Sequence, residues 1–189
     1  MSSGNELSSE TTRYVRDTCL CLHLQRAARA VARHFDEALR PLELTSGQFS
    51  LLMSLNRPRP PGIGDVSAVL AMDRTTLTAN LKPLQRRGLV EVTVGDSDRR
   101  QRQLSLTAAG RALLAAALPV WTREHAAVES LLTSTGAHPD RLRAELRALC
   151  GKGAAVPARG ENYAGLGSDL PASTATEAGG VALGRSSPG

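Results

Sequence analysis

Aromatic residues are scarce in this sequence: one Trp, two Tyr and two Phe make up 3% of its 189 residues. A core without aromatic side chains must be filled by Leu, Ala and Val, which suits packed helices better than aromatic-rich sheets. At this length, with 41% hydrophobic residues, the chain can bury one sizeable core. We therefore expect a single, mostly α-helical domain.

Long hydrophobic runs and a disulfide framework are missing as well. The longest apolar stretch, residues 112–120, is much shorter than a membrane span and contains Pro119. The first residues, MSSGNELSSETT, are polar and show no apolar run behind a charged start. Three cysteines, an odd number, do not form a disulfide framework. These absences favour a cytoplasmic protein without membrane contact.

The sequence also lacks the motifs of catalysis and metal binding. It contains no phosphate-cradling glycine loop, nucleophile elbow or HExxH spacing. The histidines at positions 23, 34, 125 and 138 are scattered, and although Cys19 and His23 are four residues apart, two ligands do not make a zinc site. We expect no enzyme, no cofactor and no metal centre.

Helical periodicity begins after about eleven polar residues, and we expect residues 1–11 to be flexible. From Thr12 to Leu39 the apolar positions form one stripe on a single long helix: Cys21, Leu24, Ala28, Val31, Phe35 and Leu39. A helix of this length would extend about 40 Å, so part of its face should pack on another subunit. Thr45 and Gln48 form a capping box that starts a second helix. A stiff, proline-rich connector at 56–62 then leads to a short helix at 63–71.

The stretch from Asp73 to Leu106 predicts a helix followed by a β-hairpin. Asp73 caps a helix that Gly88 ends, residues 89–94 and 103–106 alternate like strands, and residues 95–100 form a charged turn. With the short helix before it, this unit predicts a winged helix-turn-helix over about residues 45–106. In that motif the second helix enters the DNA major groove while the wing reaches the backbone or the minor groove.

Charge supports DNA as the partner of this unit. Residues 73–102 hold seven Lys and Arg against four Asp and Glu, which accounts for three of the formal net charge of +5. A basic excess in one compact unit is expected of a phosphate-binding surface, although a basic helix face is often merely solvated. The candidate DNA-binding residues on the helix are Arg74, Thr75, Thr76, Thr78, Lys82 and Arg86.

Two further helices and a tail complete the chain. Thr107 caps a helix from Ala108 to about Leu132, and a last helix runs from Asp140 to Leu149. From residue 151 to 189 the composition falls to Gly, Ala, Ser, Pro and Thr, so we expect this tail to be disordered.

These pieces together resemble the MarR family of winged-helix transcriptional regulators. The resemblance covers roughly Arg13 to Leu149 and rests on DRTTLTANLKPLQRRGLV, a GDSDRR wing and the helix start LTAAGRALL. Its most specific pieces are Gly88-Leu89-Val90, Asp98-Arg99-Arg100 and the segment 106–111. It implies a MarR-type domain at 12–150, in which helices 12–39 and 108–149 form a homodimer interface.

The resemblance also implies how such a dimer works. The recognition helix reads the major groove of a palindromic operator, and the wing aspartate, Asp98 here, orients Arg100 into the minor groove. Arg99 completes the wing candidates. Family members are often repressors released by a small aromatic acid, which binds between the dimer helices and the DNA-binding lobe, or by an oxidant. The alternative is a ligand- or redox-sensing dimer that acts through protein partners without specific DNA binding.

Cys21 suggests an oxidant as the signal. It falls where the organic-hydroperoxide-sensing, OhrR-like branch keeps its reactive cysteine, but the tyrosines of that branch are replaced by Gln25, Phe35 and Ser46. The other interpretation is a buried cysteine that packs as a small hydrophobe. Cys19 cannot pair with Cys21 within a regular helix, because a two-residue step points them to nearly opposite sides.

Overall fold

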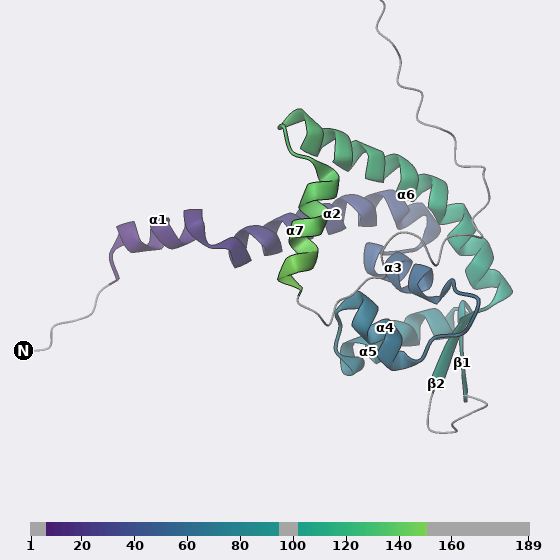
Figure 1. The fold of residues 1–189 in the computed structure, drawn as a ribbon. Coiled ribbons are helices and arrows are strands. Elements are labelled where there is room, and N and C mark those ends of the chain that lie inside the picture. The colour runs from purple at the N-terminus through teal and green to yellow at the C-terminus, as the bar shows by residue number, and fades with distance from the viewer. Residues whose placement is uncertain (1–6, 95–101, 151–189) are drawn as a thin grey trace, which may run out of the picture. The chain divides into compact units, whose positions relative to one another are not determined.

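The computed structural model describes residues 7–94 and 102–150. Its elements are α1 (Ser9–Thr18), α2 (Leu20–Leu39), the 3-10 turn η1 (Arg40–Leu42), α3 (Ser46–Leu55), α4 (Ile63–Leu70), α5 (Arg74–Arg86), β1 (Val90–Val94), β2 (Arg102–Leu106), α6 (Ala108–Ser134) and α7 (Pro139–Leu149). The predicted fold class, mostly α with a small hairpin, is confirmed (Figure 1). The predicted disordered tail lies outside the described residues.

The N-terminal helix differs from its prediction. It begins at Ser9 rather than Thr12, because the Ser8 hydroxyl accepts the N–H of Thr11 and caps it. It is also not continuous, since Cys19 has an extended backbone with φ −70° and ψ 104°. Just before this break the Thr18 hydroxyl donates to the Tyr14 carbonyl at 2.7 Å, a local bond that competes with regular helix geometry. The apolar pattern continues across the break, so periodicity could not reveal it.

The start of α3 is fixed by side chains on both sides. The predicted capping box is present: Thr45 Oγ1 accepts the N–H of Gln48 at 3.2 Å, and Gln48 Oε1 accepts the N–H of Thr45 at 3.1 Å. Asp36 of α2 accepts the Ser46 N–H at 2.6 Å. These bonds satisfy N–H groups that an isolated helix start would leave unpaired, and they hold α3 against α2.

The hairpin is joined by a third segment that the sequence did not predict. β1 and β2 pair antiparallel, with Val92 opposite Leu104. The connector before α4, expected only as a spacer, joins them: Leu104 donates its N–H to the Pro61 carbonyl at 2.9 Å, and Gly62 bridges to Gln103. Pro61 has no N–H to contribute to a sheet, but its carbonyl can accept from an edge. The connector therefore fixes α4 beside the wing.

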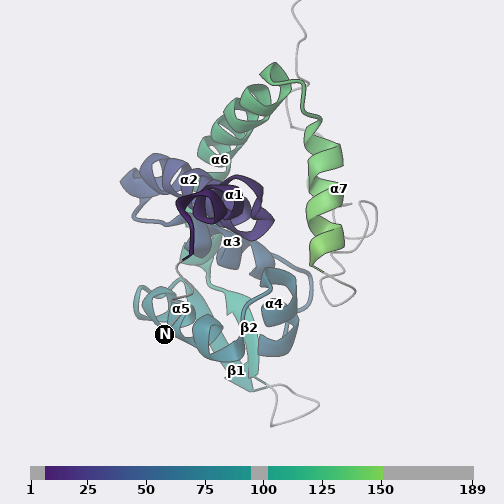
Figure 2. The same ribbon diagram turned by 90° about the vertical axis from the view of Figure 1, so that its left-hand side faces the viewer.

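One core joins these elements. The largest side chains with essentially no exposure come from α2, α3, α4, α5 and β2: Leu39, Leu51, Leu52, Val66, Leu77, Leu84 and Leu104. Both ribbon views place α3, α4, α5 and the hairpin together, on one side of α2 and α6 (Figures 1 and 2). Only the first half of α6 enters this core, through Gly110, Leu114 and Ala117.

The start of α6 is hydrogen-bonded to the turn between α5 and β1. Thr107 donates its hydroxyl to the Gly88 carbonyl at 2.7 Å and its N–H to the Leu89 carbonyl at 3.1 Å. Gly110 lies so close that a Cβ there would be 2.1 Å from the Leu89 oxygen. Only glycine allows this approach, so the long helix α6 is held in a fixed position relative to α5 and the hairpin.

The last helices lie close to their predicted positions. α6 ends at Ser134 and α7 begins at Pro139, within two residues of the expected bounds. Across the part of the chain that the structure describes, none of the helices combines the length and apolarity needed to cross a membrane.

Candidate nucleic-acid interface

Asp73 sets the first turn of α5. Its Oδ1 accepts the N–H of Thr76 at 2.8 Å and its Oδ2 accepts the Thr76 hydroxyl at 2.6 Å. These hydrogen bonds, first from the side chain and then from the backbone of Thr76, lower the pKa of the Asp73 carboxyl below its usual value. The predicted cap is therefore present and ionised at neutral pH, where its charge suits the positive end of the helix dipole.

The helix presents two distinct faces. Leu77, Leu81 and Leu84 are buried in the core. All six predicted DNA-binding positions of the helix are exposed: Arg74, Thr75, Thr76, Thr78, Lys82 and Arg86. At 1.5 Å per residue the helix is about 20 Å long, and a B-DNA major groove about 12 Å wide admits a helix. The structure therefore leaves all six predicted helix residues exposed to solvent, while the leucines of the helix face the core.

The threonine hydroxyls are not equivalent. Thr78 donates to the Arg74 carbonyl at 2.7 Å, and Thr76 donates to the Asp73 carboxylate. Since both hydroxyl protons are used within the helix, these two residues can offer a base only an accepting oxygen and a methyl group. The Thr75 hydroxyl has no hydrogen-bond partner among the residues that the structure describes, so it can donate to a base or accept from one.

Basic side chains continue toward the end of the helix. Lys82 and Arg86 line a shallow surface hollow together with Gln85. The Arg86 side chain forms no ion pair or hydrogen bond within the described ranges, 7–94 and 102–150, and can extend toward a phosphate. Arg87, the next residue, folds back onto the protein instead and donates to the Glu43 carbonyl at 2.6 Å.

The wing is described only along its strands. Val94 and Arg102 are paired at its far end, and Arg102 is exposed. The predicted wing residues Asp98, Arg99 and Arg100 lie outside the described residues, so their roles stay predictions.

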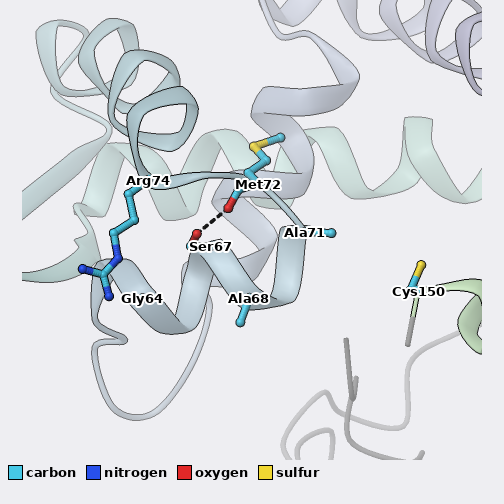
Figure 3. Close-up of a pocket in the computed structure, with 7 residues that line it drawn as sticks. All are labelled: Gly64, Ser67, Ala68, Ala71, Met72, Arg74 and Cys150. Atoms are coloured by element: carbon cyan, nitrogen blue, oxygen red, sulfur yellow. Dashed lines mark hydrogen bonds between the residues drawn. The ribbon is translucent and has the colours of Figure 1, made fainter. Parts of the chain in front are cut away.

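An open hollow of about 410 Å³ lies beside the turn between α4 and α5 (Figure 3). Small residues line it together with Met72, Arg74 and Cys150, which ends α7 on the opposite side. Ser67 donates its hydroxyl to the Met72 carbonyl and so supports this turn. Arg74 reaches over the start of α4, where a Cβ on Gly64 would lie 3.5 Å from its Nη2. The guanidinium is the charged group of the hollow.

The cysteine region differs from its predicted environment. Cys21 is exposed in the single chain, and its Sγ accepts an N–H from Gln25 at 3.3 Å, while Arg29 donates to the Gln25 oxygen at 3.1 Å. Leu24, which shares the predicted apolar stripe with Cys21, is 36% exposed. Cys19 lies between α1 and α2, so the geometry of a regular helix does not separate it from Cys21. No group of three metal-ligating side chains occurs among the described residues.

The fold and this interface define a winged helix-turn-helix protein, and known proteins agree. The sequence model of the MarR family matches residues 44–101. The Mycobacterium tuberculosis transcriptional regulator MosR, solved in complex with DNA, is 37% identical, with a TM-score of 0.61 over 70% of this chain and 93% of that chain. The transcriptional repressor CouR, bound to a 23-mer DNA duplex, is 31% identical, with a TM-score of 0.63 over 76% of this chain and 98% of that chain.

Curated relatives point the same way. The HTH-type transcriptional regulator TtmR of Methylorubrum extorquens is 33% identical over 97 residues, 51% of this chain and 50% of that protein. The chain spans about half the length of the curated relatives it matches. Its relatives are transcriptional regulators and not enzymes. The chain belongs to the MarR family.

Proposed function

We propose that this protein is a sequence-specific regulator of transcription that binds a palindromic operator in double-stranded DNA as a homodimer. The observation that carries the proposal is the amphipathic character of α5: its polar and basic side chains are exposed, and its leucines are buried in the core. MosR and CouR, both at least 31% identical to this chain, are solved with DNA.

Each part of the interface has a proposed role. Arg74, Thr75, Thr76 and Thr78 occupy the first turns of α5 and meet base edges in the major groove. Lys82 and Arg86 meet phosphates. In the wing, Asp98 pairs with the guanidinium of Arg100 and orients it into the minor groove, and Arg99 meets the backbone. Bidentate carboxylate–guanidinium geometry favours that pairing.

A homodimer is supported by the apolar side chains that the terminal helices leave exposed. Leu24 and Val31 of α2, Leu131 of α6 and Leu146 of α7 are between 36% and 68% exposed in the single chain. A two-fold dimer through these helices would place two recognition helices about 34 Å apart, one turn of DNA. This spacing is what a palindromic operator requires.

The proposed effect is repression in the cytoplasm, relieved by a small aromatic acid or by an oxidant. The hollow beside α4 suits the acid, because its lining combines small residues and Met72 with the guanidinium of Arg74. A ligand there would contact both α7 and the turn that positions α5. Cys21 is the main candidate for oxidation, and Cys19 is a second one.

Selection of bound duplexes from a random DNA pool tests the proposal. We expect an enriched palindrome, bound with an affinity that falls steeply as salt rises, because phosphate neutralisation releases counterions. A variant with both Lys82 and Arg86 changed to Gln should bind with a shallower salt dependence. If no sequence is enriched and binding does not depend on salt, the basic face is only solvated. The alternative, a sensor that acts through protein partners, would then be favoured.

A further inference from the structure

Arg87 ends α5 directly after Arg86, but its side chain takes a different path. Its Nη1 donates to the Glu43 carbonyl at 2.6 Å, and its Nη2 makes a longer 3.5 Å contact with the Leu42 carbonyl. The Glu43 carboxylate lies 3.8 Å from the same guanidinium and is itself 86% exposed, so this ion pair is weak. The short bond to the carbonyl is therefore the main link between the end of α5 and η1.

The carbonyl that accepts this bond is held in place. Glu43 has a left-handed backbone, φ 53°, and its N–H donates to the Arg40 carbonyl at 2.9 Å. Leu39 and Leu44 flank the turn and are 0% and 3% exposed. Since both ends of the turn are anchored in the core, the Glu43 oxygen is a rigid point to which a recognition helix can be tied.

This turn also lies at a junction of the fold. It follows α2 directly and contacts α6, and α2 packs along α6. The Arg87 guanidinium therefore links this junction to the end of α5, beside the direct bonds of Thr107 to Gly88 and Leu89. Packed elements joined by hydrogen bonds carry coupling of this kind.

We infer that Arg87 is a positioning residue: it ties the recognition helix to the α2–η1 junction and fixes the angle at which α5 enters the groove, without touching DNA. The inference rests on the proposed function. Two neighbouring arginines of equal charge then have different roles: Arg86 is available to contact a phosphate, whereas Arg87 is hydrogen-bonded to the Glu43 carbonyl.

The test compares Arg87→Gln with Arg86→Gln in the full-length protein. Binding to the selected operator and to random duplex is titrated across salt concentrations, after thermal unfolding has shown that both variants are folded. For Arg87→Gln we expect about tenfold weaker operator binding, unchanged binding to random duplex and an unchanged salt slope. For Arg86→Gln both DNAs should weaken alike, with a slope smaller by about 0.9.

Glu43→Asn is the matched control, because it keeps the backbone carbonyl and asparagine tolerates left-handed backbone. It should bind the operator as the wild type does. A tenfold loss in Glu43→Asn would show that the carboxylate, and not the carbonyl, is the link, which overturns the inference. So would wild-type operator binding by Arg87→Gln, or a loss on both DNAs with a reduced slope, the signature of a phosphate contact.

Hydrogen exchange in the free protein separates this inference from the proposed function. Arg87→Gln should speed exchange of the Glu43 and Leu44 amides, which close the turn onto Arg40 and Leu39. Wild-type exchange at these amides would overturn the tie itself, whatever the protein binds. If the wild type selects no operator while these amides do respond to Arg87→Gln, the proposed function fails and the positioning of α5 on DNA fails with it.

Discussion

Two regions of this chain differ in how much of their apolar surface they bury within a single chain. The recognition lobe, residues 44–106, buries most of its leucines, and its one large exposed apolar side chain among the described residues is Val94. The helical arm, formed by α1, α2, α7 and the second half of α6, buries one residue, Leu39, among the described residues. The lobe is thus complete within one chain, whereas the arm has an apolar face that a second copy would cover.

Polar bonds take the place of a core within the arm. Arg143 of α7 donates to Glu129 of α6 at 2.6 Å and to Asp140 at 2.7 Å. Its hydrogen bonds, first with Asp140 and then with Glu129, raise the pKa of the guanidinium above its ordinary value. Partly exposed ion pairs of this kind contribute little stability, about 0 to 1 kcal/mol each. The contact between α6 and α7 is therefore the weaker part of the chain.

The largest expected effect comes from the core of the lobe. Leu84→Ala removes a side chain with 0% exposure and should lower the free energy of unfolding by about 2 to 5 kcal/mol. Leu146→Ala, at a position 37% exposed on α7, is the matched change in the arm and should cost less than about 1 kcal/mol at low protein concentration. Urea denaturation of both variants gives the comparison. Equal losses would mean that the arm is as well packed as the lobe.

The second effect concerns association. Leu24→Glu places a charge twice in a two-fold interface, and we expect the dimer dissociation constant to rise by about a hundredfold or more, because a charge is costly to bury. Val94→Glu, at an exposed position of the hairpin, should leave association unchanged. Light scattering over a micromolar dilution series measures both. A wild-type protein that is monomeric throughout would end the comparison, since the arm would then need no second copy.

Local signals explain why so much of the lobe was predictable. Thr45, Asp73 and Thr107 each precede a helix and accept the N–H expected of a cap. Gly88, with φ 66°, ends α5 where predicted. The exposed positions of α5 followed from the spacing of its leucines. Each of these features depends on residues within about four positions, so one stretch of sequence contains all the information.

The structural features that the sequence did not predict depend on residues far apart in the chain or leave no trace in the apolar pattern. The acceptor of Arg87 lies 44 residues away in the chain, and no local pattern relates the two. Pro61 pairs with Leu104, which a proline-rich segment does not suggest. The break at Cys19 leaves the apolar periodicity intact and was therefore invisible. The sequence identified the exposed surface of α5, but not which of its basic residues bond back onto the fold.

The third effect is on operator binding. Arg100→Ala should weaken it by about 1 to 3 kcal/mol if the guanidinium enters the minor groove as proposed. Lys82→Ala should lower affinity for all sequences alike, since phosphates carry no sequence information. Arg141→Ala, paired with Glu145 on α7, is the control in the arm and should change neither. Unaltered binding by both Arg100→Ala and Thr76→Ala would remove the lobe from the interface.

The fourth effect is smaller and depends on pH. The hydrogen bonds from Thr76 lower the pKa of Asp73 in the folded protein, so the ionised carboxylate adds stability above the unfolded value of about 3.9. That stability is lost as pH falls through the folded pKa. Asp73→Asn keeps a capping side chain without the charge, and should lower Tm by about 1 to 3 °C at pH 7. Below the folded pKa the two proteins should melt together. A difference that persists in acid would point to lost packing instead.

In the absence of an oxidant, the smallest effect is expected at Cys21, which lies on α2 in the helical arm. Cys21→Ser should bind the operator as the wild type does. An organic hydroperoxide should change this, since attack of the thiol on the peroxide gives a sulfenic acid and an alcohol. The exposed sulfur already accepts an N–H from Gln25.

Oxidation at this position would act on the dimer rather than on DNA. Cys21 shares a stripe with Leu24 and Val31, so added oxygen would meet the covering copy and alter the separation of the two lobes. Operator binding is titrated with hydroperoxide in the wild type and in Cys21→Ser, with Cys19 and Cys150 kept in both. We expect loss of binding in the wild type alone. Identical responses would leave Cys21 as a packing residue and turn attention to the hollow beside α4, where a small aromatic acid would have to act on the lobe itself.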